Sequence, residues 1–536
     1  MALNTTHYQR EVSYNKRINT HTSRLCLLLH LFYPYLLRYP AQTLSVHLHL
    51  LPTTPPSPSV CNSCYLHPLS THGTHLPPTR LPPNPPTTHT SPPAHTPSRP
   101  SSSNAKMNRL SHLTRTLSSR STRSAMNDST RCFNDAYKSN ICNANQTKEF
   151  NTLHKLAAPK EYQADGLSLT IHHNGVCQYE IQRPKQLNAI NHDIVTAMTA
   201  FFTAADKLQY CKAIIMTGAG NKSFCAGGDI RQASSSPPEY AIKFFALEYL
   251  TDYLTSITNK PMLSIWKGFV MGGGVGISLF GRYRIATDDT IFSMPETVIG
   301  FFPDCGVTSQ LCKIKCGVGL YAGLTAARLN AHDVMKYGLA THFIPQTEMS
   351  QFLNELNQTN LGDEEEAVKS IEIILNKYSD NAFERLTPNI GDDIENGMNV
   401  YSSKASSFQD FYSILKANEG DSFCQQTLQH MSNKSPLSCA VYWRQYHLCK
   451  SNNMSLLDAL KLEYRLAQTF VLKDPNFKEG VRATLVDKDN KPKWSHTFAS
   501  PNLDEDAASL FDNPNAIDME TALSMQGGPT LANYVM

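Results

Sequence analysis

Three consecutive glycines, Gly272–Gly274, constrain the fold of this chain more than any other feature. They follow an apolar run at 262–266 that predicts a buried strand, and they precede a helix expected from about Val275. Because glycine has no side chain, a ligand can lie directly against the backbone N–H groups of such a turn. The first N–H groups of a helix are unpaired and stand at the positive end of its dipole. The segment therefore predicts a binding place for a negatively charged oxygen.

Strand and helix patterns alternate around this turn, which predicts an α/β fold. Apolar and polar residues alternate in Leu167–Ile171 and Val176–Ile181, which flank Asn174-Gly175, so a β-hairpin is expected there. A helix at 192–208, a buried strand at 213–217 and a helix at 237–255 are expected to follow.

The first 127 residues differ in composition from the rest of the chain. They hold 12 of the 48 lysines and arginines, one acidic residue (Glu11), 17 of the 32 prolines and 11 of the 20 histidines. Such a segment cannot bury enough apolar surface to form a core. We predict a low-complexity region at 1–106, which is either a mis-annotated upstream extension or a disordered one. The remaining residues are slightly acidic, so their charge does not indicate a nucleic-acid partner.

Residues 107–127 contain four arginines, many serines and threonines, and no acidic residue. This composition is typical of a mitochondrial transit peptide, although it lies 106 residues into the chain. We predict a transit peptide and linker at 107–160, no fold before about residue 160, and a location in the mitochondrial matrix. A generic flexible linker over 1–160 is the structural alternative.

The fourteen cysteines lack the spacing of a secreted disulfide framework, so we expect free thiols in a reducing compartment. Cys61 and Cys64 have the spacing of metal ligands but no second pair, so a zinc site is not expected there. No run reaches the roughly 20 apolar residues that span a bilayer, and the nearest candidate, Leu25–Leu37, is interrupted by His30 and Pro34. We therefore expect no membrane association.

Four short motifs carry a resemblance to a known family. They are Phe224–Ile230, Met271–Gly276, Met294–Thr297 and Phe302–Gly306. Together they resemble the crotonase (enoyl-CoA hydratase/isomerase) superfamily, and within it the group that hydrolyses 3-hydroxyisobutyryl-CoA. Residues 479–494 resemble the C-terminal signature of that group, so the resemblance covers about 162–500.

The resemblance implies the fold beyond what periodicity gives. We expect an α/β fold with a crotonase-like spiral of β-β-α repeats at 161–350 and a helical C-terminal part at 351–500. The acidic run Asp363–Glu366 is interpreted as a solvated linker or a surface helix. Residues 501–536 are expected to form a flexible tail.

The resemblance also implies an oxyanion hole from two backbone N–H groups, those of Gly228 and Gly273, which lie 45 residues apart. Asp229 would cap the next segment, which is a structural role. Related hydratases carry a glutamate three residues after the oxyanion glycine, where this chain has Gly276. Hydration of a double bond with two carboxylates is therefore disfavoured.

Three carboxylates match the pattern of the hydrolase group. Glu296 would attack the thioester carbonyl or activate water as a general base, and its structural alternative is a helix-start glutamate after proline. Asp304, eight residues later, would accept a hydrogen bond from the substrate hydroxyl or orient water; alternatively it is an N-terminal helix charge. Glu248 would contact the substrate, unless it is a solvated residue on a helix face.

Coenzyme A contacts are implied at Lys185, Ala189 and Ala226, with Lys185 pairing a phosphate, although the first two also fit a simple strand-to-helix turn. The lysines around Lys488 either hold nucleotide phosphates or pair with nearby acids, and we favour the second. This chain departs from the group's pattern at Val307 and at Ala246-Leu247, so the preferred acyl group is left open.

The expected function is hydrolysis of 3-hydroxyisobutyryl-CoA in valine catabolism. The only expected ligand is the small-molecule acyl-CoA, without a metal or redox cofactor, nucleic acid or membrane; the pattern allows a homo-oligomer. One alternative is hydration or isomerisation of an enoyl-CoA. The other is a non-catalytic subunit of the mitochondrial ribosome, because relatives of this hydrolase group resemble proteins recruited to that role.

Overall fold

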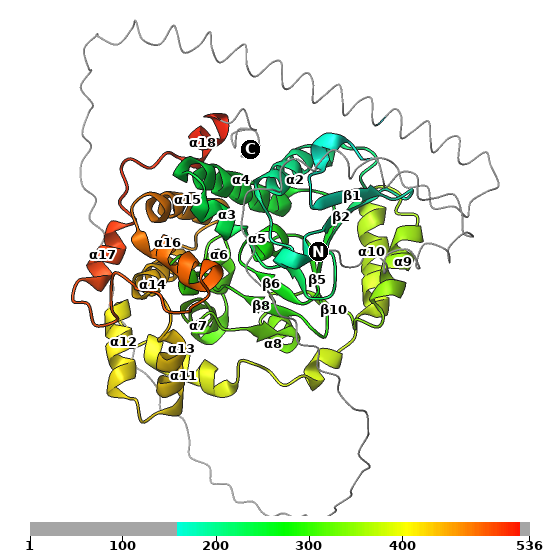
Figure 1. The fold of residues 1–536 in the computed structure, drawn as a ribbon. Coiled ribbons are helices and arrows are strands. Elements are labelled where there is room, and N and C mark those ends of the chain that lie inside the picture. The colour runs from blue at the N-terminus through cyan, green and yellow to red at the C-terminus, as the bar shows by residue number, and fades with distance from the viewer. Residues whose placement is uncertain (1–133, 135–157, 526–536) are drawn as a thin grey trace, which may run out of the picture. The chain divides into compact units, whose positions relative to one another are not determined.

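The strands form two sheets in the computed structural model, which describes residues 134 and 158–525 (Figure 1). The six-stranded sheet has the order β1 (Leu167–Ile171), β2 (Val176–Ile181), β3 (Ala213–Gly218), β5 (Met262–Trp266), β7 (Tyr283–Ala286) and β10 (His342–Phe343). The four-stranded sheet has the order β4 (Ser223–Cys225), β6 (Phe269–Met271), β8 (Ile291–Ser293) and β9 (Leu329–Asn330). Only the outer pairs β1–β2 and β8–β9 of these sheets are antiparallel.

The spiral predicted from the resemblance is confirmed by this topology. Each of the pairs β3–β4, β5–β6 and β7–β8 places one strand in each sheet, and the next pair lies beside it. Helical turns follow these pairs: α3 (Ile230–Ser235), α5 (Gly273–Leu279) and the short 3₁₀ segment η4 (Glu296–Ile299). The glycine turn therefore leads from the end of β6 directly into α5.

Several elements predicted from periodicity are confirmed within one to four residues. The hairpin β1–β2 pairs Leu167 with Ile181 and Ile171 with Cys177. The remaining helices before residue 340 are α2 (His192–Ala204), α4 (Pro238–Ile257), α6 (Thr308–Leu311), α7 (Val318–Thr325) and α8 (Ala331–Lys336). Helix α4 has buried residues all along its length because it lies between α2, α5 and α15 (Leu456–Leu472).

The acidic run at 363–366 begins a packed helix and its side chains are exposed, so the surface-helix alternative is confirmed and the solvated linker is wrong. Helices α9 (Met349–Gln358) and α10 (Glu364–Tyr378) bury Phe352, Leu356 and Ile371 in one apolar cluster with residues of the six-stranded sheet. The acidic side chains stand at the start of α10, where Asp363 accepts a hydrogen bond from the N–H of Glu366. Negative charge is favourable there because of the helix dipole.

The C-terminal helices extend further than predicted. They are α11 (Asp392–Ser402), α12 (Phe408–Ala417), α13 (Ser422–Met431), α14 (Pro436–Ser451), α15, α16 (Pro475–Val481), α17 (Leu503–Ser509) and α18 (Met519–Met525). The prediction of a flexible tail is wrong for 503–525, since Leu503, Ala507 and Leu523 are buried in the main hydrophobic core. Each of these two helices has only seven residues, which is too short for a periodicity argument to detect.

Several other predictions are settled by the described residues, and some lie outside them. The nine cysteines in this part of the chain are free thiols, as predicted. No described helix is long and apolar enough to cross a membrane. The predictions for 1–106, for Cys61 and Cys64, for the transit peptide and for the end of the tail lie outside the described residues. The lysines around Lys488 are expected to pair with nearby acids. Those acids are instead bound by Arg482, which contacts Glu479, Asp487 and Asp489.

Candidate active site

The two loops predicted to contact coenzyme A are bonded to each other. The Ala226 N–H donates to the Leu187 carbonyl at 3.0 Å. The Arg183 guanidinium donates to the Ala189 carbonyl at 2.6 Å and to Asp229 Oδ2 at 2.9 Å. These bonds bring Ala189 and Ala226 into one loop pair.

The buried side chain of Asn188 holds the first of these loops. It accepts a hydrogen bond from the Arg183 N–H and donates to the carbonyls of Ala219 and Ser223. Asn188 itself has a left-handed φ of 58°, a conformation that asparagine adopts more readily than most residues with a side chain. Lys185 lies exposed on the same loop, where its ammonium group can reach a phosphate in solvent.

Asp229 has the structural role predicted for it. Its Oδ1 accepts the N–H of Gln232 at 3.2 Å and so caps α3. Because its other carboxylate oxygen accepts from Arg183, this carboxylate is already occupied. It fixes the position of the preceding glycine relative to the loop of Arg183.

The amide groups of Gly228 and Gly273 are close neighbours. The β-bridge between Ile190 and Gly228 uses the Gly227 carbonyl and the Asp229 N–H, so it does not use the Gly228 N–H. Gly273 is the first residue of α5, and its amide belongs to the first turn that finds no partner within the helix. A Cβ built on Gly273 would lie 3.4 Å from the Gly228 nitrogen. The predicted pair of oxyanion donors is therefore brought together.

Glu248 and Glu296 face the glycine turn from opposite elements. A Cβ on Gly273 would collide with Glu248 Oε1, and one on Gly272 would lie 2.9 Å from Glu296 Oε1. Glu248 is 2% exposed and Glu296 is 6% exposed, so the alternative of a solvated Glu248 is wrong. Glu296 is the first residue of η4 and follows Pro295, as expected for a helix-start glutamate. It is nevertheless buried against the glycine turn. One oxygen of each carboxyl has no hydrogen-bond partner among the described residues.

Asp304 lies in a loop four residues before α6, so its interpretation as a helix-terminal charge is wrong. It is 4% exposed, and its Oδ2 accepts a hydrogen bond from the Tyr249 hydroxyl at 2.7 Å. Burial raises the pKa of Asp304 to about 6, while the hydrogen bonds from Tyr249 and Cys305 lower it. This carboxyl therefore changes charge slightly below neutral pH.

Replacing Tyr249 by phenylalanine is expected to raise the pKa of Asp304 further, because it removes a hydrogen bond that favours the ionised carboxylate. Activity that needs ionised Asp304 falls below about pH 6 in the native chain. In the variant this fall is expected at a higher pH, and kcat/KM measured from pH 5 to 8 checks it. An unchanged acid limb would show that Asp304 does not set it and that Glu296, whose pKa burial and Asp304 also raise, does so.

Asp252, which the sequence analysis did not single out, fills the space beside Gly276. A Cβ on Gly276 would lie 2.6 Å from Asp252 Oδ2 and 2.7 Å from the Cβ of Cys305. Asp252 is fully buried, and neither of its oxygens has a hydrogen-bond partner among the described residues. Burial and the nearby Glu248 raise its pKa well above the usual value, which favours the neutral form of the carboxyl. Its position four residues after Glu248, on the same helix face, is a signal that could have found it.

Glu463 of α15 is a fifth buried carboxyl. It completes a group that we call the carboxyl cluster. The carboxyl cluster consists of Glu248, Asp252, Glu296, Asp304 and Glu463. None of the ion pairs formed by the described residues involves any of them. Burial raises the pKa of each, and for all of them except Asp304 the charge of other members adds to this.

Oxygens of Glu248 and Asp304 and the sulfur of Cys305 all lie within 4.8 Å of one another. Such a set of donors could hold a cation. Protonation of the closely spaced buried carboxyls also relieves the repulsion between their negative charges, without a cation.

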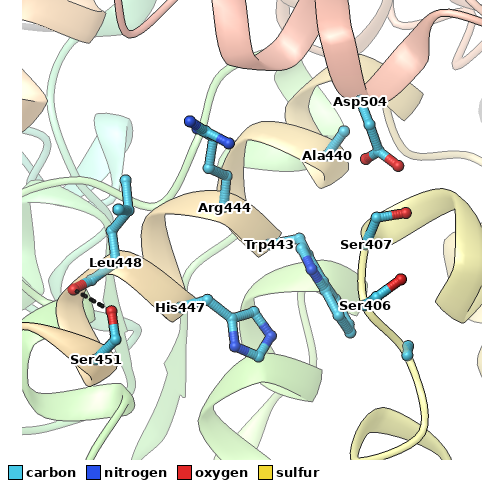
Figure 2. A pocket seen from close by; sticks show the side chains of 10 residues that line it. Ser406, Ser407, Ala440, Trp443, Arg444, His447, Leu448, Ser451 and Asp504 are labelled. Atoms are coloured by element: carbon cyan, nitrogen blue, oxygen red, sulfur yellow. Dashed lines mark hydrogen bonds between the residues drawn. The ribbon is translucent and has the colours of Figure 1, made fainter.

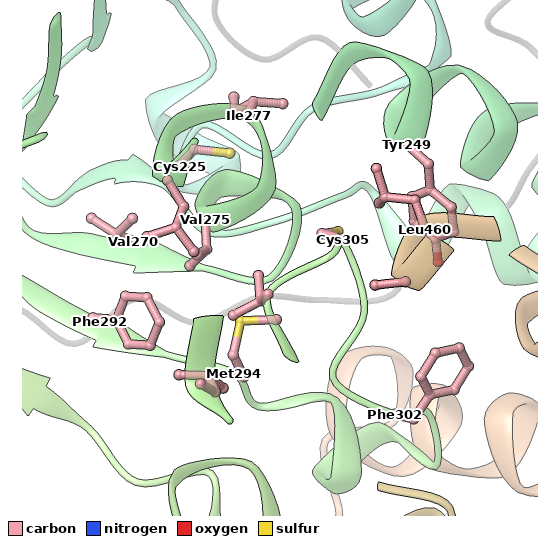
Figure 3. Close-up of a cluster of buried hydrophobic side chains, with 14 of the residues drawn as sticks. Cys225, Tyr249, Val270, Val275, Ile277, Phe292, Met294, Phe302, Cys305 and Leu460 are labelled. Atoms are coloured by element: carbon pink, nitrogen blue, oxygen red, sulfur yellow. The ribbon is translucent and has the colours of Figure 1, made fainter. Parts of the chain in front are cut away.

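Apolar side chains surround the cluster. Figure 3 labels Cys305 on its loop among Tyr249 of α4, Val275 and Ile277 of α5, and Leu460 of α15. All of these except Leu460 belong to elements before residue 310, and all are buried in the main core. Water is thus largely excluded, so hydrogen bonds and charges act more strongly here than at the surface.

The cavity shown in Figure 2 is separate from this site. It has a volume of about 370 Å³ and is lined by Trp443, Arg444 and His447 of α14, together with residues next to α12 and on α17. No member of the carboxyl cluster lines it. Helix α14 therefore presents one face to this cavity and directs Gln445 toward the Asp304 loop, where Gln445 donates to the Pro303 carbonyl.

Comparison with known proteins agrees with this geometry. The enoyl-CoA hydratase/isomerase family matches residues 176–511. The mitochondrial 3-hydroxyisobutyryl-CoA hydrolase of Dictyostelium discoideum is 34% identical over 344 residues, which are 62% of this chain and 87% of that protein. The protein of the same name from Homo sapiens is 32% identical over 345 residues, 63% of this chain and 87% of the relative. A crystal structure of a carnitinyl-CoA dehydratase from Mycobacterium thermoresistibile is 27% identical, covers 66% of this chain and 98% of its own, and has a TM-score of 0.58.

Proposed function

The chain belongs to the enoyl-CoA hydratase/isomerase family, and we propose that it hydrolyses the thioester of 3-hydroxyisobutyryl-CoA. The observation that carries this proposal is the glycine turn with Glu296 beside Gly272 and no side chain at Gly276. The curated relatives that match are named for this hydrolysis, which belongs to valine catabolism. The family also includes hydratases, but Gly276 lacks the side chain that supplies their second carboxylate, and the carboxyl that fills this space, Asp252, has its pKa raised by burial.

In the proposed reaction the thioester oxygen accepts hydrogen bonds from the N–H groups of Gly228 and Gly273. These donors stabilise the negative charge that the oxygen acquires as the tetrahedral intermediate forms. Ionised Glu296 then either removes a proton from the attacking water or attacks the carbonyl carbon itself to form an anhydride that water hydrolyses. In both routes the carbon–sulfur bond breaks, the CoA thiolate leaves and takes up a proton, and a carboxylic acid is formed.

Asp304 and Glu248 are proposed to bind the polar end of the acyl group or the water. Both are buried, and Glu248 Oε1 has no hydrogen-bond partner among the described residues. A substrate hydroxyl can supply that partner, which an unsubstituted acyl chain cannot. The nucleotide end would lie on the loop pair, with backbone contacts near Ala189 and Ala226 and a phosphate near Lys185.

The protein is inferred to be mitochondrial because the matching relatives are named so. We propose the matrix as its compartment, in keeping with the transit-like composition of 107–127. We also propose that the reaction needs no metal or redox cofactor, since Glu296 and the amide pair supply the required chemistry. A homo-oligomer without nucleic-acid or membrane partners remains a proposal.

The direct test is thiol release from 3-hydroxyisobutyryl-CoA by the purified full-length chain. We expect rapid release that persists after dialysis against EDTA, and only slow hydration of crotonyl-CoA. Loss of activity on metal removal, restored by a divalent cation, would contradict metal-free chemistry. Rapid hydration without thiol release would favour the hydratase alternative. Absence of both reactions, together with co-sedimentation with ribosomal subunits, would favour the non-catalytic alternative.

A further inference from the structure

The loop that carries Asp304 has an unusual backbone conformation. Cys305 has a φ of 59° and Gly306 a φ of 70°, so two successive residues are left-handed. For a residue with a side chain such as Cys305, this conformation is strained and persists only when the surroundings hold it. The loop therefore needs support from outside its own sequence.

Glu463 of α15 supplies a direct bond to this loop. Its Oε2 accepts the N–H of Gly306 at 2.6 Å, and its Oε1 accepts Nε2 of Gln445 at 2.8 Å. Both side chains are fully buried. A buried carboxyl without these two donors would be left unsatisfied, so the pair and the loop stabilise one another.

Gln445 of α14 holds the other side of Asp304. Its Nε2 lies 3.0 Å from the Pro303 carbonyl and 3.0 Å from Thr308 Oγ1. Glu463 thus contacts the residue two positions after Asp304, and Gln445 contacts the residue just before it. The backbone on both sides of this carboxyl is fixed by side chains from the C-terminal helices.

Packing fixes α15 against the same loop. A Cβ on Gly306 would collide with Leu456 and lie 3.3 Å from Leu460, both on α15. Tyr464, next to Glu463, packs edge-on against the ring of Tyr249, the residue that donates to Asp304. Any shift of α15 would therefore move the loop and the hydrogen-bond donor of Asp304 together.

We propose that Glu463 and Gln445 are positioning residues that hold Asp304 in its working orientation, and that the C-terminal helices α14 and α15 thereby complete the active site. This inference rests on the proposed function, since it assigns the pair a role in that same site. The pair acts through the loop and not on the substrate.

The first test is a double-mutant cycle on thioester hydrolysis. Replacing Glu463 by leucine is expected to lower kcat/KM about 100-fold, the effect of misplacing a group by about 1 Å. In an Asp304→Asn background the same replacement should have little further effect, because the group that it positions is already lost. Glu463→Gln, which keeps an oxygen for the Gly306 N–H, should give an intermediate loss. Equal losses in both backgrounds would overturn the proposal.

The matched control is Gln468→Leu on the same helix. Gln468 is 2% exposed and bonds to the backbone of Ile517, away from the Asp304 loop. This variant should lose stability as Glu463→Leu does. Its effect on kcat/KM should be small and the same with and without Asp304→Asn.

The second test does not depend on activity. Amide hydrogen exchange in peptides that span 303–311 should be at least tenfold faster in Glu463→Leu than in the native chain, and unchanged in Gln468→Leu. If the native chain releases no thiol, the proposed function fails, and this measurement still decides whether the pair holds the loop. Unchanged exchange in Glu463→Leu, or in Gln445→Leu if that variant does not fold, would overturn the proposal.

Discussion

Replacing Glu296 by glutamine is expected to lower kcat for thioester hydrolysis by about 10²- to 10⁴-fold, the usual contribution of a positioned acid–base group. Glutamine keeps the size and the hydrogen-bonding oxygen of the side chain but can neither accept a proton nor form an anhydride. Burial and the nearby Asp304 raise the pKa of Glu296 well above its usual value, so the charged form of this carboxyl is unfavourable in the folded chain. The neutral amide should therefore preserve the fold or stabilise it slightly, and a thermal melt checks this.

The control for this variant is Glu372→Gln, an exposed glutamate of α10 whose ion pair with Arg282 lies at the surface. It should hydrolyse the substrate at the native rate. If Glu296→Gln retains a rate within a few-fold of the native chain, Glu296 is not the central carboxylate and the proposed chemistry is wrong.

Labelled water separates the two routes that Glu296 could take. If an anhydride forms and water attacks its enzyme-side carbonyl, repeated turnover in ¹⁸O-water places ¹⁸O in the Glu296 side chain. Mass analysis of the peptide that contains Glu296 detects this label. General-base catalysis leaves the peptide unlabelled and places ¹⁸O only in the acid product.

The sequence was informative where chemistry depends on short motifs. Gly228, Gly273, Glu296 and Asp304 each lie inside a local pattern, and the structure brings all four together. The hairpin and α2 were predictable because their apolar residues repeat with the period of the element. Such motifs and periodicities can be recognised in the sequence because they depend on residues that are close together along the chain.

The parts that could not be predicted depend on contacts between distant segments. Glu463 bonds to a residue 157 positions earlier, and Gln445 bonds to Pro303 142 positions earlier. No local pattern distinguishes either residue from other polar positions on amphipathic helices. Asp252 was missed for a different reason, since its spacing from Glu248 was visible but Gly276 was interpreted only as the loss of a carboxylate. The structure shows that this glycine also leaves room for one.

Replacing Gly273 by alanine keeps the backbone N–H but is expected to lower kcat/KM by about 10²- to 10³-fold, as much as the loss of one oxyanion donor, because the new methyl group blocks access to the N–H. The new methyl group would collide with Glu248 Oε1 and stand 3.4 Å from the Gly228 nitrogen. It would therefore occupy the space between the two amides where the thioester oxygen is proposed to bind. Because Gly273 is buried, some loss of thermal stability should accompany the loss of activity.

Two further variants separate blockage of the amide pair from displacement of Glu248. Gly420→Ala is the control for the substitution itself, since a Cβ there would meet no atom within 4 Å, and its rate should be native. Glu248→Ala removes the side chain with which the new methyl group collides. If the amide pair binds the oxygen, Gly273→Ala/Glu248→Ala should remain far slower than Glu248→Ala alone, because the methyl group still fills the oxyanion position. Equal rates in these two variants would show that Gly273→Ala acts only by displacing Glu248, and would remove the evidence for oxyanion binding at Gly273.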